Sequence, residues 1–185
     1  MTSRREQILS TAAELFAERG FHGVSVVELG AACGMSGPAL YRHFASKNAV
    51  LAAMLVSISE ELLAVGRERV AQADSPVEAV RALVGWHVDF ALANPSLIVV
   101  QDRDWASLPA DAREQVRSLQ RRYVELWVGQ LRHVHRHLTA KRARAMAHAT
   151  FGLLNSTPHS AMLSESEMRT MLETMALNAL DIVRT

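Results

Sequence analysis

Three serines, Ser25, Ser36 and Ser46, each stand where a new helix can begin, and they divide the N-terminal region into very short helical segments. Ser25 and Glu28 have the spacing of a capping box, in which the serine hydroxyl accepts from the Glu28 amide and the carboxylate reaches back. The segment after Ser36 predicts a helix over about 37 to 44. A helix of two turns buries little apolar area, so we expect it to insert into another molecule instead of packing in the protein's own core.

Helical periodicity continues through the rest of the chain. Further helices are predicted at about 4 to 20, from near 26, and at 47 to 72, 77 to 93, 96 to 104, 110 to 137, 140 to 157 and 165 to 183. Breaks such as Asn94-Pro95 and Leu108-Pro109 separate them. The sequence carries no strand pattern, internal repeat or low-complexity segment, so we predict an all-α fold.

Composition restricts the class of protein. Cys33 is the single cysteine, which excludes an intramolecular disulfide and favours a reducing, cytoplasmic compartment. We expect Cys33 to be a small buried residue rather than a redox sensor. No apolar run approaches the ~20 residues that cross a bilayer, and no signal peptide is recognisable, so no membrane partner is expected. The formal net charge of +1 means that binding to nucleic acid needs locally placed groups.

Two short capped helices joined by a tight turn predict a helix-turn-helix, whose second helix can enter the major groove of DNA. Serines at helix starts offer backbone amides to phosphates, small residues let the backbone approach the groove, and tyrosine, histidine and lysine suit phosphate contacts. Arg42 suits either a phosphate or a guanine. The predicted DNA-binding residues are Ser25, Ser36, Gly37, Pro38, Ala39, Tyr41, Arg42, His43 and Lys47.

The stretch FHGVSVVELGAACGMSGPALYRHFASKNAVL at 21 to 51 resembles the N-terminal signature of the TetR family of transcriptional regulators. The resemblance implies a DNA-binding domain over 1 to 46 and a ligand-binding and dimerisation domain over 47 to 185. It places in DNA contact every residue named above except Arg42. Asn48 replaces the acidic residue that usually follows the Ser-Lys pair, which affects helix capping and leaves the DNA assignment intact.

Large aromatic and polar side chains recur on the predicted helices between 77 and 160, in the mixture that lines small-molecule pockets. The predicted ligand-binding residues are Trp86, His87, Phe90, Trp105, Tyr123, Trp127, Phe151, Asn155 and His159. The alternative is that each is an ordinary core residue; this reading is at least as good as a pocket for any single residue and is the one we favour for His87, whereas for the whole set the TetR resemblance favours a pocket. A basic stretch at 121 to 144 suits an anionic ligand such as an acyl-CoA, although a solvated charged face is the simpler interpretation.

The last two predicted helices carry apolar stripes suited to a four-helix interface around a two-fold axis. The predicted dimer residues are Ala143, Ala147, Phe151, Leu154, Met168, Met171, Leu172, Met175, Ala179 and Ile182. The alternative is that these stripes cover the core of a single chain.

Of the three histidines His133, His135 and His137, the first and last share a helical face, and no carboxylate or cysteine lies beside them, so we predict no metal and no cofactor. No nucleophile-base signature indicates an enzyme. We therefore predict a dimeric repressor that a small, mainly apolar effector releases from a palindromic double-stranded operator. The alternative is a helical small-molecule or acyl-CoA binding protein without DNA recognition.

Overall fold

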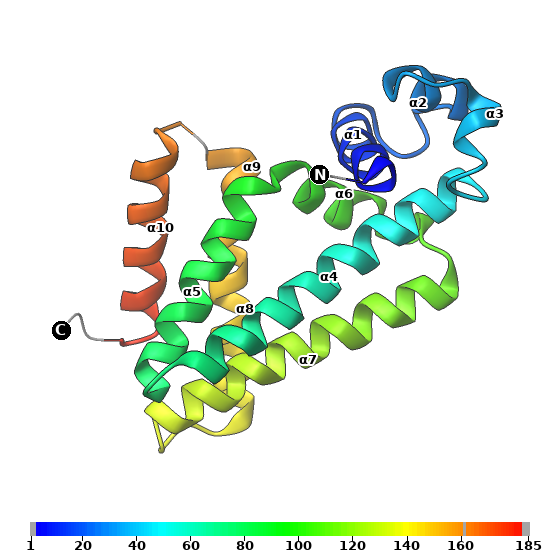
Figure 1. Ribbon diagram of the computed structural model, residues 1–185. Helices are drawn as coiled ribbons and strands as arrows, with labels where there is room; N and C mark the ends of the chain where they lie inside the picture. Colours follow the sequence, from blue (N-terminus) through cyan, green and yellow to red (C-terminus); the bar gives the residue numbers. More distant parts are fainter. Residues whose placement is uncertain (1–2, 161, 183–185) are drawn as a thin grey trace. The chain divides into compact units, whose positions relative to one another are not determined.

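The computed structural model describes residues 3–160 and 162–182, and these are helical with no strand among them, as predicted (Figure 1). The helices are α1 (Arg4–Arg19), α2 (Val26–Ala32), α3 (Gly37–Leu40), α4 (Lys47–Gln72), α5 (Pro76–Ala93), α6 (Pro95–Asp104), the 3-10 turn η1 (Trp105–Ser107), α7 (Ala110–Val134), α8 (Ala140–Leu154), α9 (Thr157–Ser160) and α10 (Glu165–Ala179).

The predicted helix starts agree closely with the structure, whereas several helix ends come earlier. Regular α-helix stops at Leu40 instead of about 44, and single turns continue the chain, with the Phe44 amide donating to the Leu40 carbonyl at 3.1 Å. The helix predicted over 140 to 157 is interrupted after Leu154 and resumes as α9. The predicted end of the last helix, at 183, lies outside the described residues.

The chain forms two compact units. The first contains α1 to α3, α4 as far as Ile58, and Ser96–Arg117; the second contains Ser59–Pro95 and the chain from Ser118 onward. This division differs from the predicted boundary at 46, because α6 and the first turns of α7 pack with the N-terminal helices. Val100 and Val116 are fully buried in that N-terminal core.

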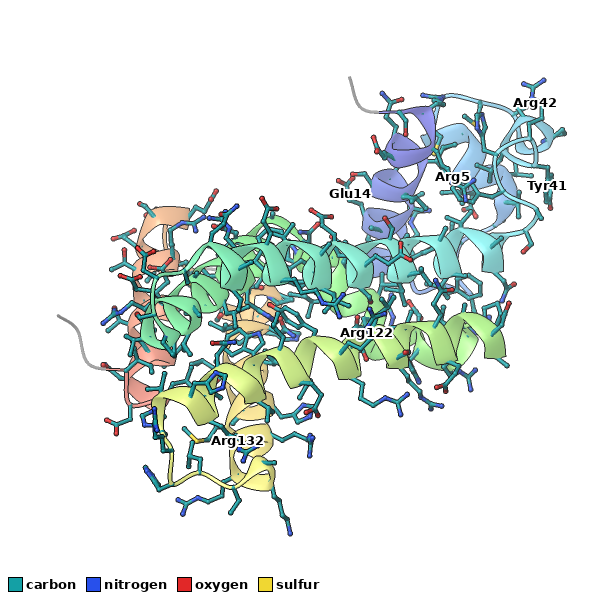
Figure 2. The ribbon with its side chains drawn as sticks, turned by 60° about the horizontal axis from the view of Figure 1, so that its bottom comes forward. Arg5, Glu14, Tyr41, Arg42, Arg122 and Arg132 are labelled. Atoms are coloured by element: carbon teal, nitrogen blue, oxygen red, sulfur yellow. The ribbon has the colours of Figure 1, made fainter. Side chains whose placement is uncertain are left out.

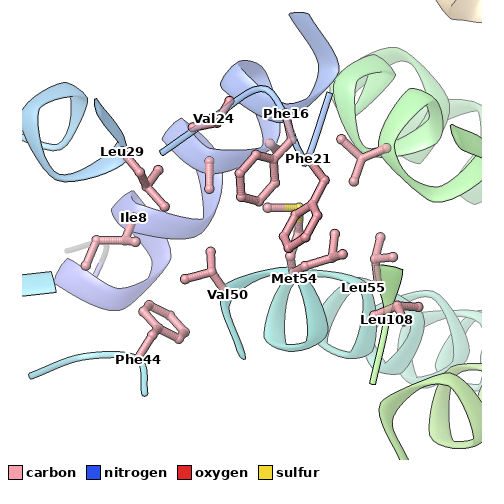
Figure 3. Packing of buried hydrophobic residues seen from close by; sticks show 14 of the residues in the cluster. Ile8, Phe16, Phe21, Val24, Leu29, Phe44, Val50, Met54, Leu55 and Leu108 are labelled. Carbon is pink, nitrogen blue, oxygen red and sulfur yellow. The ribbon is translucent and has the colours of Figure 1, made fainter. Parts of the chain in front are cut away.

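Side chains from α1, α2 and α4 fill the core of the first unit (Figure 3). Its fully buried members include Ile8, Phe16, Leu29, Val50 and Leu51. At 25 cal/mol per Å², burying one such side chain contributes about 2 kcal/mol. This core fixes α2 and the short α3 on the surface of the unit.

Arg103 of α6 caps the C-terminus of α1. Its guanidinium donates to the carbonyl oxygens of Phe16 and, at 3.0 Å, of Ala17, and it pairs with the buried carboxylate of Asp104 at 3.0 Å. The last carbonyls of a helix have no partner within the helix, so Arg103 satisfies two of them and joins α6 to α1.

Helix α4 is long and apolar enough to cross a membrane by length and composition, with a mean hydropathy of 1.8 over its best window, 39% of which is buried inside the chain. This differs from the prediction that no apolar run in the sequence approaches the length of a membrane span. The helix supplies Val50, Leu51, Met54 and Leu55 to the core of the first unit, and Leu63 is buried in the second. Buried core helices of soluble proteins meet the same two criteria.

In the second unit, α10 packs against α5 and α8. Arg169 of α10 forms an ion pair with Asp89 of α5. Just beyond α10, the carbonyl of Leu180 accepts a hydrogen bond from Nε2 of His135 at 2.9 Å. These contacts fix one face of α10 to its own chain.

Candidate functional site

Helices α2 and α3 are in close backbone contact at Gly30. A Cβ at this position would lie 3.0 Å from the backbone nitrogen of Gly37 and 3.1 Å from the carbonyl oxygen of Met35, closer than side chains normally approach. Gly34, with φ of 66°, supplies the left-handed turn between the two helices. Gly30 is not among the predicted site residues, although a glycine inside a seven-residue helix is a signal of close approach.

Several predicted DNA-contacting residues are open to solvent around the start and end of α3. Tyr41 is 53% exposed, and both it and Arg42 project outward from the turn after α3 (Figure 2). Ser25 and Ser36 cap α2 and α3, their hydroxyl oxygens accepting from amides at 3.2 and 3.3 Å. Because each hydroxyl only accepts in these caps, its own O–H is available to a phosphate oxygen.

The structure corrects the expected placement of Gly37 and gives Lys47 a role that the sequence did not suggest. Gly37 is buried against α2 instead of facing outward. The Lys47 ammonium donates to the carbonyl oxygens of Phe21 and Val24, each at 2.7 Å, and lies 4.4 Å from the centre of the Phe21 ring. Lys47 therefore fastens the loop between α1 and α2, and a phosphate contact through its third N–H stays a prediction.

The remaining predicted residues are less open. Ala39 and His43 are half-buried. The backbone carbonyl of His43 accepts from the Arg5 guanidinium at 2.6 Å, and the same guanidinium stacks 4.0 Å from the centre of the Phe44 ring. Arg5 thus holds the end of the α3 region onto α1.

Val27 is an exposed residue of this surface that is not among the predicted DNA-binding residues. Its side chain is 71% exposed in the first turn of α2, and a Cβ on Gly37 would lie 3.7 Å from its Cγ2 atom. An apolar side chain beside the start of the groove-entering helix suits contact with a thymine methyl. The alternating polar and apolar pattern gave no reason to single it out.

A hydrogen-bonded chain of three side chains lies inside the second unit. Nδ1 of the His87 ring lies 3.3 Å from the Tyr123 hydroxyl oxygen, and Nε2 lies 3.0 Å from Oδ1 of Asn155. The Asn155 oxygen can only accept, so Nε2 carries the proton and Nδ1 accepts from the tyrosine hydroxyl. Burial lowers the pKa of His87 from 6.5 to about 4, so the ring is neutral at pH 7.

Aromatic rings surround the hydrogen-bonded side chains of His87, Tyr123 and Asn155. Phe151 stacks on His87 with ring centres 4.8 Å apart, and Trp127 meets Phe151 edge-on at 5.0 Å. Burial raises the pKa of the Tyr123 hydroxyl, which stays protonated. The indole N–H of the fully buried Trp127 faces the Tyr123 hydroxyl but forms no hydrogen bond of normal geometry with any described residue. A poorly satisfied donor inside an apolar cluster is costly and suits a ligand that brings an acceptor.

The structure brings together six of the predicted ligand-binding residues, namely His87, Phe90, Tyr123, Trp127, Phe151 and Asn155. It places the other three elsewhere. Trp86 donates to the Leu62 carbonyl at 3.2 Å, Trp105 packs on the core of the first unit, and His159 is exposed on α9. The break after α8 is used by Asn155 and by Thr157, whose hydroxyl donates to the Ala91 carbonyl at 2.8 Å.

Seven of the ten predicted dimer residues face the interior of their own chain, which corrects that prediction. Phe151 stacks on His87, and six others are at most 3% exposed, namely Ala143, Ala147, Leu154, Met168, Leu172 and Ile182. Their apolar stripe covers the core of the single chain. Met171, Met175 and Ala179 are exposed on α10, so their contact with a second copy stays a prediction.

Cys33 is buried, and burial raises the pKa of its thiol, as expected for a structural cysteine. Such a thiol is a poor nucleophile, because the thiolate is the reactive form.

Two family descriptions match this chain. "Bacterial regulatory proteins, tetR family" matches residues 8–54, and "Tetracyclin repressor-like, C-terminal domain" matches residues 73–159. Together they cover more than two thirds of the sequence. The chain is also 30% identical over 131 residues to the HTH-type transcriptional repressor KstR2 of Rhodococcus jostii, a match that spans 70% of this chain and 64% of that relative.

Solved structures share the fold. A TetR-family transcriptional regulator from Bordetella parapertussis matches with a TM-score of 0.84 at 23% identity over the full length of both chains. AibR, crystallised with isovaleryl coenzyme A and operator DNA, matches with a TM-score of 0.76 at 21% identity over 94% of this chain and 97% of that one. Both likenesses establish the fold.

Proposed function

Because the chain belongs to the TetR family of bacterial regulatory proteins, we propose that it is a cytoplasmic transcriptional repressor, and no enzyme, that binds a palindromic operator as a homodimer. A small effector that binds the second unit releases it from DNA. The observation that carries the proposal is the surface at α3, where Pro38, Tyr41 and Arg42 are exposed while backbone contact at Gly30 holds α3 against α2.

A side chain that contacts a base edge or a phosphate must be exposed to solvent, and the backbone that carries it must be held in a fixed position. Arg42 meets the first condition, and the capping bond of Ser36 to the Ala39 amide, at 3.3 Å, supports the second. A guanidinium can donate two hydrogen bonds to guanine or neutralise a phosphate. Tyr41 can donate to a phosphate oxygen from the same turn.

Fluorescence anisotropy with the duplex upstream of the protein's own gene tests DNA binding. Arg42→Ala is expected to weaken binding by about 1–3 kcal/mol and, if it meets a phosphate, to lower the slope of log affinity against log salt by about one. The matched control is Arg132→Ala, which removes an exposed arginine from α7 (Figure 2). Equal affinity of all three proteins for operator and for unrelated duplex would remove the proposal.

For the dimer interface we propose the outward faces of α8 and α10. The α8 face offers the exposed small residues Ala145, Ala149 and Gly152, which permit close helix approach. The α10 face carries Met171 and Met175, 36% and 46% exposed, beside a shallow groove of about 470 Å³. Exposed methionines at helical spacing suit burial against a partner helix.

Sedimentation equilibrium tests this interface. Met175→Glu should convert the dimer to monomer at micromolar concentration, because it buries a charge without a partner. Met162→Glu, at a methionine that is 90% exposed and lies outside every helix, is the control and should leave the dimer intact. A Met175→Glu protein that remains fully dimeric would contradict the proposal.

For the effector we propose an acyl thioester of coenzyme A. The apolar rings around His87 and the poorly satisfied indole donor of Trp127 suit the acyl group of a thioester, whose carbonyl oxygen can accept a hydrogen bond. The fold is shared with AibR, which was crystallised with isovaleryl coenzyme A. Native mass spectrometry of the protein purified from its host tests the proposal, because a retained thioester gives a mass increment that coenzyme A standards identify. A retained ligand without a thioester would contradict it.

A further inference from the structure

A groove of about 480 Å³ lies between α4 and α7 in the second unit. Three of the side chains that line it are arginines, Arg67 from α4 and Arg121 and Arg122 from α7. Figure 2 shows Arg122 projecting from α7. The groove is within the ~300–1,000 Å³ range of small-molecule sites. The sequence showed only a basic stretch along α7, and the fold adds a cation from a second helix.

In the part of the chain that the structure describes, the charge of two of these three arginines, Arg67 and Arg122, is not balanced by a neighbouring carboxylate. Among the described residues, neither Arg67 nor Arg122 makes a hydrogen bond or ion pair. The carboxylate that lines the groove, Glu125, accepts from Nε of Arg144 at 3.1 Å and is therefore already paired. Like charges around one concavity raise the local concentration of anions. In a chain of net charge +1, three arginines at one groove are a marked concentration.

The groove adjoins the buried aromatic cluster through one position, Gly66. Leu126, the apolar residue lining the groove, and Tyr123, a member of the cluster, both pack against the α4 backbone there. A Cβ at Gly66 would lie 3.3 Å from Cδ2 of Leu126 and 2.8 Å from Cε2 of Tyr123. Leu126 and Tyr123 therefore close the space at Gly66, between the arginines and His87, and an apolar chain that passes there has to displace both side chains.

We propose that the groove lined by Arg67, Arg121 and Arg122 binds the phosphate-bearing headgroup of the effector, whose apolar chain passes over Leu126 beside Gly66 to the aromatic cluster. This inference rests on the proposed function, because it assigns a place to one end of the effector. A guanidinium binds phosphate oxygens bidentately, and an apolar chain replaces water against Leu126. The effector is then an amphipathic anion, anchored at both ends.

Isothermal titration calorimetry of the full-length protein tests the headgroup site with four probes: decanoyl-CoA, coenzyme A, decanoate and inorganic phosphate. The double variant Arg67→Gln/Arg122→Gln should bind decanoyl-CoA and coenzyme A about tenfold more weakly, from the loss of two partly solvated ionic contacts. Decanoate binding should not change. Arg132→Gln/Arg136→Gln removes two exposed arginines outside the groove and should match the wild type.

The variant Gly66→Ala tests the passage. Its methyl group would displace the Tyr123 ring, so affinity for decanoyl-CoA should fall while that for coenzyme A is kept, with the melting temperature confirming the fold. Wild-type affinity of the double variant for decanoyl-CoA, or tighter binding of inorganic phosphate than of coenzyme A, would overturn the headgroup site. Calorimetry contains no DNA, so a failure here is distinct from a failure to bind the operator.

Discussion

Buried neutral His87 should make the stability of the second unit fall steeply in mild acid. Its pKa is about 4 in the folded chain and near 6.5 when unfolded, the cause being burial. Between these values the unfolded state binds a proton that the folded state excludes, so the free energy of unfolding decreases as the pH falls from about 6.5 to about 4. At 1.36 kcal/mol per pKa unit, the loss between about pH 7 and about pH 5 is about 2 kcal/mol.

Urea unfolding followed by tryptophan fluorescence, at one protein concentration and at both pH values, measures this loss. Other groups also titrate, so the informative quantity is the difference between variants. In His87→Gln the decrease from pH 7 to pH 5 should be smaller than in the wild type by about 2 kcal/mol. His159→Gln, at an exposed histidine, is the control and should keep the wild-type decrease.

A second measurement is independent of unfolding. The ring proton resonances of His87 should stay constant from about pH 7.5 down to about pH 5, whereas an exposed histidine titrates near 6.5. If His87 titrates near 6.5, or if wild type and His87→Gln lose the same stability in acid, the reasoning from burial is refuted.

Three further changes affect the first unit. Gly30→Ala should separate α2 from α3, lowering the free energy of unfolding by about 1–3 kcal/mol and weakening DNA binding in anisotropy; the exposed neighbour change Ala31→Ser should do neither. Lys47→Met removes two hydrogen bonds to loop carbonyls and should cost about 2 kcal/mol in urea unfolding, so unchanged stability would contradict its fastening role. Arg103→Gln leaves buried Asp104 without its cation and should cost about 1–2 kcal/mol, discounted because the arginine is partly exposed; a variant as stable as wild type would contradict the cap.

Local signals predicted the helices well. The capping serines fixed the starts of α2 and α3, and α4 begins and ends at the predicted residues, because caps and periodicity act within one turn of the chain. The exposure of Tyr41 and Arg42 was also predictable, because the short helical segment after Ser36 is too small to bury its polar residues.

Contacts between residues far apart in the sequence could not be predicted from caps and periodicity. Lys47 donates to carbonyls more than twenty positions earlier, and nothing in its neighbourhood indicates that. The apolar stripe of α8 was assigned to a partner, but Ala143 and Ala147 meet their own chain. Periodicity shows that a face is apolar and does not show what covers it. The groove lined by Arg67 and Arg122 lies between α4 and α7, and the sequence does not show that these two helices pack side by side.

The first unit is assembled from two stretches of chain, one ending at Ile58 and one spanning Ser96–Arg117. Exchanging operator specificity between regulators by cutting once after α3 or within α4 would strip Val100, Leu108 and Val116 from its interior. A functional chimera that carries this first unit on another regulator therefore has to include both stretches, or redesign the core positions that the second stretch fills.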